Sequence, residues 1–356
     1  MKDIDTLIFP RWLIPVESQG LVLENHALAI NDGRITAIVP AADAETQFQA
    51  RETVHLANHA LIPGLINAHT HAAMSLMRGL ADDLPLMEWL EGHIWPAEGK
   101  HMSSEFVAHG VELAMAEMLR GGTTCFNDMY FFPDITAQAA AKAGMRASVG
   151  MILIDFPTVW AQNPQEYIEK GLAVRDKYRD HPLVTTMFAP HAPYTVSDEP
   201  LQKIRVFADE MDLRIHMHVH ETAFEVTEAE KQSGKRPLAR LKELGLLTPN
   251  LLAVHMTQLT DAEIADCAEA GINVLHCPES NLKLASGLCP VQKLLDAGIN
   301  VALGTDGAAS NNDSDMLGEM RTAALIGKIA SNDAAALPAA ATLHMATLGG
   351  AKALGI

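Results

Sequence analysis

Two histidines one residue apart, His69 and His71, end an apolar run that is typical of a buried β-strand. Residues i and i+2 of a strand point to the same side, so both imidazoles can reach one metal ion. Farther along the chain, His218, His255 and Asp306 each stand at the end of another short apolar run. The spacing therefore predicts four strand ends that meet around a metal.

Size and charge indicate an enzyme with one large and one small domain. The chain has 356 residues, 48% of them hydrophobic and 20% charged, and a formal net charge of −18. Nucleic-acid backbones and anionic membranes require basic surfaces, so we expect neither as a partner. The N-terminus lacks the features of a signal peptide and no apolar run could span a bilayer, so we expect a cytoplasmic protein. A small neutral or cationic substrate fits this charge better.

The four cysteines show no C-x-x-C pair and are expected to be reduced, buried thiols; they are Cys125, Cys267, Cys277 and Cys289. Segment 276–279 (His-Cys-Pro-Glu) resembles only superficially the H-x-E and P-C-x-x-C signature of cytidine-type zinc deaminases. No H-E-x-x-H motif occurs, which removes the common zinc-protease interpretation.

Residues 1–60 differ from the rest of the chain. They read as a small β domain, with short strands at 6–9, 20–23 and 26–35 and a hairpin signal at Asp32-Gly33. From residue 61 to 356 the pattern becomes strand, loop and helix, repeated. Helices are expected at 105–120 and 201–211, and strands at 61–68, 123–128, 147–154, 184–189, 213–219, 251–255, 272–276 and 299–304. Eight such units predict an α/β fold, a (β/α)₈ TIM-like barrel with its active site at the carboxyl ends of the strands.

The chain resembles the amidohydrolase superfamily, and within it the 5′-methylthioadenosine and S-adenosylhomocysteine deaminases. The resemblance covers nearly the whole chain and is carried by residues 63–71, 95–98, 191–194, 277–281 and 304–307, together with His218, Glu221 and His255. It implies one divalent ion per chain, Zn²⁺ with Fe²⁺ or Mn²⁺ as alternatives. The implied metal ligands are His69, His71, His218 and Asp306.

The resemblance also implies a hydrolytic deamination of an adenine ring. Glu98, His191 and Glu221 would contact the purine, and His255 would flank a metal-bound water whose pKa falls to about 7 on zinc. Glu221 would deliver a proton to the ring and Asp306 would take one from the attacking water. From the residues alone, Glu98 could instead be a solvated loop carboxylate, and His191 a loop residue held rigid by its neighbouring prolines.

The strand at 213–219 leaves a choice of ligand, because His216, His218 and His220 alternate along one of its faces. The family spacing, a histidine followed three residues later by Glu221, selects His218. His216 would then lie deeper in the barrel as a hydrogen-bonded core residue, and His220 would lie near the loop.

Two departures from the family pattern stand out. Residues 184–190 contain no lysine of the kind that bridges two metals in binuclear members, so a single metal is expected. Relatives also continue past a segment like 350–355 with strands that complete a small β-sandwich domain, whereas this chain stops at Ile356. We therefore expect the C-terminal strands of that domain to be missing.

The substrate is expected to be a purine nucleoside, most readily 5′-methylthioadenosine, with S-adenosylhomocysteine and adenosine as further candidates. The long loop 72–100 is rich in apolar residues, including Trp95, which could line a nucleoside pocket or form a contact in a homo-oligomer. Met151 stands where family members can carry a carboxylate-binding arginine. A methylthio group would suit such a pocket better than an amino-acid tail.

Two other functions remain open from the sequence. One is the hydrolysis of another heterocycle, such as deamination of guanine or dechlorination of a triazine, and release of chloride would separate it from deamination. The other is an inactive, metal-binding barrel that serves as an assembly subunit. The presence of Glu221, His255 and Asp306 together argues against a scaffold, because assembly requires none of them.

Overall fold

The computed structural model describes residues 1–356 and divides them into two compact units, Met1–Gly64 and Leu65–Ile356. The first unit is one five-stranded sheet in which β1 pairs antiparallel with β2 and β3 and parallel with β5, while β3 pairs with β4. Its elements are β1 (Lys2–Leu13), β2 (Leu23–Glu24), β3 (His26–Asn31), β4 (Arg34–Pro40), α1 (Ala41–Gln47) and β5 (Phe48–Leu61).

The turn between β3 and β4 confirms the predicted hairpin. Asn31 pairs with Arg34, and φ is 51° at Asp32 and 69° at Gly33. Positive φ at both central residues gives the turn that matches the twist of the two strands. The sequence analysis missed β5, because most of its side chains are exposed and mark no buried face.

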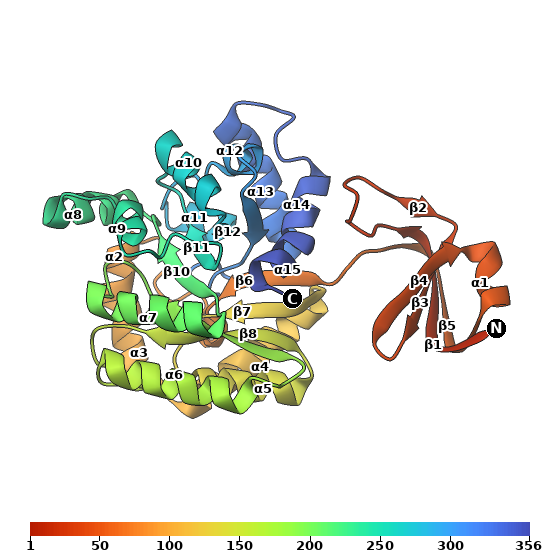
Figure 1. Ribbon diagram of the computed structural model, residues 1–356, viewed down its shortest axis with the longest axis horizontal. Helices are drawn as coiled ribbons and strands as arrows, with labels where there is room; N and C mark the ends of the chain where they lie inside the picture. Colours follow the sequence, from red (N-terminus) through yellow and green to blue (C-terminus); the bar gives the residue numbers. More distant parts are fainter. The chain divides into compact units, whose positions relative to one another are not determined.

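The second unit is a barrel of eight parallel strands whose order around the sheet follows the chain. Figure 1 shows the strands of this unit surrounded by helices. Its strands are β6 (Leu65–Thr70), β7 (Thr123–Asp128), β8 (Arg146–Leu153), β9 (Val184–Pro190), β10 (Ile215–Val219), β11 (Leu251–His255), β12 (Asn273–His276) and β13 (Asn300–Leu303). The predicted barrel is confirmed. The largest shift in a strand start is that of the first strand, which begins at Leu65 instead of 61 because Ile62, Pro63 and Gly64 separate β5 from β6.

The helices follow the strands, and side chains cap several of them. Ser103 accepts a hydrogen bond from the Phe106 N–H at the start of α4, and Thr260 forms a capping box with Glu263 at the start of α10. The segments are α4 (Ser104–Arg120), α5 (Pro133–Ala143), α6 (Pro164–Tyr178), α7 (Asp198–Met211), α8 (Ala223–Ser233), α9 (Pro237–Glu243), α10 (Asp261–Ala270), α11 (Pro278–Lys283), α12 (Val291–Asp296), α13 (Met316–Ser331), α14 (Ala339–Met345) and α15 (Leu348–Leu354).

Residues 72–100, expected to be a long loop, contain four short helical segments. They are η1 (Ala72–Met77), α2 (Leu86–Trp89), η2 (Leu90–Ile94) and α3 (Trp95–His101). Their buried side chains, among them Trp89 and Ile94, join the core formed with α4 and α5. The segment after β6 is therefore a packed wall of the barrel mouth.

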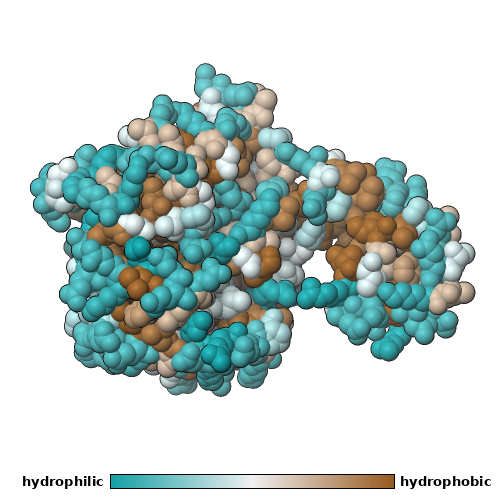
Figure 2. Space-filling view, viewed as in Figure 1, coloured by the Kyte–Doolittle hydropathy of each residue, from teal (hydrophilic) through white to brown (hydrophobic).

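The surface and the thiols agree with the composition. Figure 2 shows hydrophilic residues over much of the visible face of the barrel unit. None of the helices has both the length and the apolar character needed to cross a membrane. All four cysteines are buried and unbridged, as predicted.

The first and last strands of the barrel meet at a seam that has no regular ladder. The Asp306 N–H donates to the His69 carbonyl at 3.0 Å. Asn67 and Thr305 exchange two hydrogen bonds of 2.8 and 2.9 Å. A Cβ at Gly304 would lie 2.6 Å from the His69 nitrogen, so only glycine permits this approach. The seam thereby fixes His69 relative to Asp306.

Replacing Gly304 by alanine should lower the free energy of unfolding by about 1–3 kcal/mol, because the added methyl group overpacks the seam. Denaturant unfolding of the zinc-loaded protein measures this. Gly121→Ala is the matched control, since its Cβ would meet only ordinary contacts at 3.5 Å or more. Equal stability of the two variants would contradict the account of the seam.

Candidate active site

Four side chains bring one ligand atom each into a small volume at the barrel mouth. The Nε2 atoms of His69 and His218 lie 3.2 Å apart, and Asp306 Oδ1 lies 3.3 Å from His69 Nε2 and 3.2 Å from His71 Nε2. All four ligand atoms lie within 4.8 Å of one another. Tetrahedral zinc with bonds of about 2.0–2.1 Å places its ligand atoms about 3.3 Å apart. The donor set and its spacing therefore fit one zinc ion.

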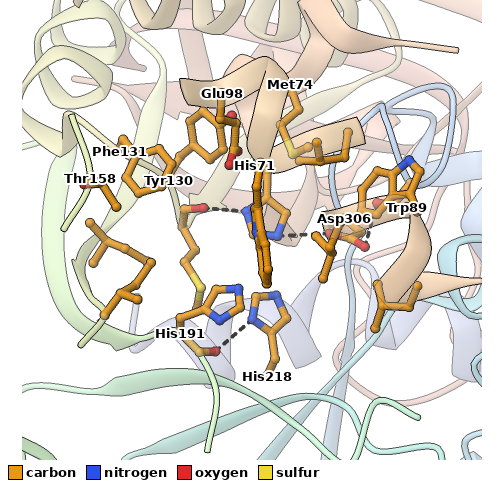
Figure 3. Close-up of a pocket in the computed structure, with 18 of the residues that line it drawn as sticks. His71, Met74, Trp89, Glu98, Tyr130, Phe131, Thr158, His191, His218 and Asp306 are labelled. Atoms are coloured by element: carbon orange, nitrogen blue, oxygen red, sulfur yellow. Dashed lines mark hydrogen bonds and ion pairs between the residues drawn. The ribbon is translucent and has the colours of Figure 1, made fainter. Parts of the chain in front are cut away.

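Backbone carbonyls orient two of the histidines. The Nδ1 atom of His71 donates to the Met129 carbonyl at 2.5 Å, and that of His218 donates to the His191 carbonyl at 2.8 Å. A donor role at Nδ1 leaves Nε2 free to bind a metal. Figure 3 shows His71, His218 and Asp306 converging on the same space.

A buried histidine orients the third ligand. His69 Nδ1 lies 2.8 Å from His216 Nε2, and His216 Nδ1 lies 3.3 Å from the amide nitrogen of Asn127. His216 is thus a hydrogen-bonded core residue, as predicted from its position on β10. The sequence did not reveal that its partner is His69, because the two residues lie on different strands.

The carboxylate of Asp306 is held by donors on both of its oxygens. The hydroxyls of Ser280 and Ser310 donate to Oδ2 at 2.6 and 2.7 Å, and the Gly307 N–H donates to Oδ1 at 2.8 Å. The backbone of Asp306 has a φ of 65°, a strained conformation that these contacts stabilise. Sequence analysis noted Ser280 only within a motif and missed Ser310.

Protonation within the cluster favours a cation at its centre. Burial lowers the pKa of His69 to about 4 and that of His218 well below its usual value. Although burial opposes it, hydrogen bonding to His69 and His71 holds the pKa of Asp306 well below its usual range. Burial likewise opposes a charge on His71, yet Asp306 raises its pKa to about 9. Positive charge is thus stabilised between Asp306 and His71, at the position that a metal cation would take.

His255 and Glu221 lie side by side next to the cluster. His255 Nδ1 lies 2.8 Å from Asn281 Oδ1, and its Nε2 lies 3.8 Å from Glu221 Oε1. The Glu221 carboxyl is buried, and this burial raises its pKa. Glu221 is thereby favoured as a proton donor at a pH where Asp306 is ionised.

Glu98 and His191 both face the same cavity. The Tyr130 hydroxyl donates to Glu98 Oε1 at 2.7 Å, and burial raises the pKa of Glu98 to about 7. His191 Nδ1 lies 3.0 Å from the Thr195 hydroxyl, and burial lowers the pKa of His191 to about 3. The alternative of a solvated loop carboxylate for Glu98 is therefore wrong. Tyr130 was not anticipated, because nothing in its local sequence indicates a partner on another segment.

The cavity above the cluster has a volume of about 240 Å³ and largely apolar walls. The Trp95 ring packs against Phe156 with ring centroids 6.1 Å apart. No lysine or arginine lines the cavity. Its apolar lining includes Met74, Leu86, Trp89, Trp95, Phe131, Ile152, Ile154, Phe156 and Val159.

The prediction that Met151 contacts the substrate is wrong. A Cβ at Gly171 of α6 would lie 2.9 Å from Met151 Cβ and 3.5 Å from its sulfur, so this side chain packs against the helix layer. The next residue, Ile152, lines the cavity instead. Side chains alternate along a strand, so an error of one residue reverses the face.

A buried glutamate that sequence analysis missed shapes the segment around Glu221. The carboxyl group of Glu225 accepts hydrogen bonds from the N–H groups of His220 at 3.1 Å and Glu221 at 2.8 Å. Burial raises the pKa of Glu225 to about 8. A glutamate in the first turn of α8 reads from the sequence as an exposed residue, which explains the omission.

Comparison with protein families and curated proteins gives a consistent result. The model described as Amidohydrolase family matches residues 60–356. The chain is 52% identical over 353 residues to a 5-methylthioadenosine/S-adenosylhomocysteine deaminase of Teredinibacter turnerae, covering 99% of this chain and 80% of the relative. A deaminase of the same name from Saccharophagus degradans is 53% identical over 352 residues, covering 99% of this chain and 79% of the relative.

Solved structures show the same architecture. An adenosine deaminase from Xanthomonas campestris with bound zinc has a TM-score of 0.98 and 55% sequence identity to this chain. The match covers 99% of this chain and 81% of the deaminase chain. An atrazine chlorohydrolase from Arthrobacter aurescens complexed with zinc has a TM-score of 0.91 and 25% identity, covering 98% of this chain and 83% of its own.

The raised pKa of Glu225 predicts a specific pH dependence of stability. Between its usual value of 4.5 and about 8, the folded state binds more protons at Glu225 than the unfolded state does. This contribution to the free energy of unfolding therefore falls as pH rises through that window, by up to about 1.4 kcal/mol per pH unit.

Denaturant unfolding of the zinc-loaded protein at several pH values tests this. Glu225→Gln should make the slope shallower than in the wild type, because the titrating group is gone. Glu230→Gln, an exposed position on the same helix, should leave the slope unchanged. Identical slopes for the wild type and Glu225→Gln would show that Glu225 does not titrate in this window.

Proposed function

The chain belongs to the amidohydrolase family, and from that premise we propose that it is a zinc-dependent deaminase of adenine nucleosides, acting on 5′-methylthioadenosine. The proposal is carried by the opposite protonation of two carboxyl groups in one cavity. Burial favours a proton on Glu221, whereas hydrogen bonding keeps Asp306 ionised. A neighbouring acid and base with separated pKa values is the arrangement that proton transfer requires.

His69, His71, His218 and Asp306 would hold the zinc ion, as their donor set and spacing support. The ion supplies Lewis acidity, which lowers the pKa of a coordinated water to about 7. The remaining chemistry falls to the chain's own side chains.

In the proposed reaction, water adds to C6 of the adenine ring while Glu221 gives its proton to N1. Asp306 accepts a proton from the attacking water and passes it to the departing amine. The C6–N bond breaks and ammonia leaves. The proton that remains on the added oxygen returns to Glu221, which restores the acid and leaves a 6-oxopurine nucleoside. His255 Nε2 points toward Glu221 and would accept a hydrogen bond from the O–H group that adds to C6, a contact that is strongest in the transition state.

The cavity supports a nucleoside with an uncharged 5′ substituent. Glu98 and His191 would supply polar contacts to the purine nucleoside, and the walls around Trp95 and Phe156 would cover its apolar parts. The relatives at 52–53% identity are named deaminases, which favours an amine over chloride as the leaving group.

Glu221→Gln should lose at least about 100-fold in kcat while keeping its zinc, as expected when a general acid is removed. His218→Ala should lose zinc itself, because a ligand is missing. Steady-state ammonia release and elemental analysis measure the two effects, with Glu230→Gln as the control that changes an exposed glutamate nearby. Near-normal turnover of Glu221→Gln would show that another group acts as the general acid.

5′-Methylthioadenosine should have a higher kcat/KM than S-adenosylhomocysteine, by roughly 5- to 150-fold. The charged tail of the latter would meet no cation in the cavity, which costs about 1–3 kcal/mol. Val159→Arg should narrow the gap by placing a cation at the cavity wall, and Val159→Met is the uncharged control. Equal or better efficiency of wild-type protein with S-adenosylhomocysteine would contradict the proposed preference.

A further inference from the structure

A group of unsatisfied polar atoms lies behind His255, outside the reaction cavity. Neither ring nitrogen of His276, at the end of β12, has a hydrogen-bond partner, and the same holds for Nδ2 of Asn281 on α11. The two side chains are only 2% and 3% exposed. An unpaired buried donor or acceptor costs about 1–3 kcal/mol. A partner that is not a protein group would remove part of this cost.

Both residues line one small cavity of about 10 Å³ between β12 and the helices α11 and α13. The rest of its lining is apolar side chain or backbone, apart from the Cys289 thiol. A cavity of about 10–15 Å³ holds one water molecule. The volume thus matches a single water with polar atoms on two sides.

A metal ion fits this cavity poorly. Burial raises the pKa of the Cys289 thiol well above its usual value, so the thiol keeps its proton. The only group of three or more side chains arranged to hold a metal is the one that contains Asp306. Burial lowers the pKa of His276 to about 3, so its ring stays neutral and can both accept and donate a hydrogen bond to water.

We propose that His276 and Asn281 bind one buried water and that this water holds the Asn281 amide in the orientation that sets the tautomer of His255. Asn281 Nδ2 donates to the water, and the water donates to the unprotonated nitrogen of His276. Asn281 Oδ1 then accepts from His255 Nδ1 across 2.8 Å. With its proton on Nδ1, His255 presents an unprotonated Nε2 toward Glu221, 3.8 Å away.

His276 and Asn281 are therefore positioning residues, because they touch neither the reacting atoms nor the metal ligand atoms. Without the water, the amide could rotate and Nδ2 could face His255, which would move the imidazole proton to Nε2. The ring would then offer a donor where the proposed reaction uses an acceptor. Only this kinetic consequence rests on the proposed function.

A crystal structure of the zinc-loaded protein tests the water directly. We expect electron density about 2.7–3.2 Å from Asn281 Nδ2 and from one ring nitrogen of His276. In the same sample, ¹⁵N NMR of labelled histidines should show the His255 proton on Nδ1. A dry cavity, or a proton on Nε2, would overturn the inference, and neither observation depends on a variant or on turnover.

Variants test the link to His255. His276→Phe should shift His255 to a mixture of tautomers and lower kcat about tenfold, a typical contribution of one oriented hydrogen bond. KM and zinc content should stay unchanged. His276→Gln should recover most of the activity because its amide can bind the water. Ile326→Val, which trims an apolar residue of the same lining, is the control for packing.

Unchanged tautomer and kcat in His276→Phe would overturn the inference. Failure of the proposed function would look different: no nucleoside would release ammonia, while the density and the wild-type NMR spectrum would stand. A dry cavity in the wild-type protein, together with the expected loss of kcat in Glu221→Gln, would refute this inference alone and leave the proposed function standing.

Discussion

The contact between the first and last barrel strands is the constraint on which the site depends. Gly304 brings β13 against His69, and the Asp306 N–H binds the His69 carbonyl at 3.0 Å. Two metal ligands, one on the first barrel strand and one just after the last, thereby meet, with His69 Nε2 at 3.3 Å from Asp306 Oδ1. The contact that closes the barrel is therefore also the contact that brings these metal ligands together.

Around that contact, each reactive group is held by a partner that acts on its other atoms. The Nδ1 atoms of the histidine ligands are hydrogen-bonded to backbone carbonyls or to His216. Asp306 Oδ2 accepts hydrogen bonds from hydroxyls, and His255 Nδ1 is hydrogen-bonded to Asn281. Each partner fixes which atom faces the cavity and in which protonation state. Burial raises the pKa of Glu221, whereas hydrogen bonding to His69 and His71 holds that of Asp306 low despite its burial. A single apolar cavity therefore contains both an acid and a base.

Local patterns in the sequence predicted the barrel and the strand ends that meet around a metal, because a histidine or aspartate at the end of an apolar strand is visible within a few residues. The choice of His218 over His216 and His220 came from the family resemblance. Met151 was misplaced because the strand's phase was wrong by one residue. The strand β5 was missed because its exposed polar residues mark no buried face. Ser310, Tyr130 and Glu225 could not be predicted, since their roles arise from contacts between segments that only the fold brings together.

One measurement tests the central claim most directly: titration of metal-free protein with zinc while ammonia release from 5′-methylthioadenosine is followed. The donor set of three histidines and one aspartate predicts that activity rises linearly and stops at about one zinc per chain. Activity that keeps rising to a second equivalent, or zinc binding without any release of ammonia, would contradict the account.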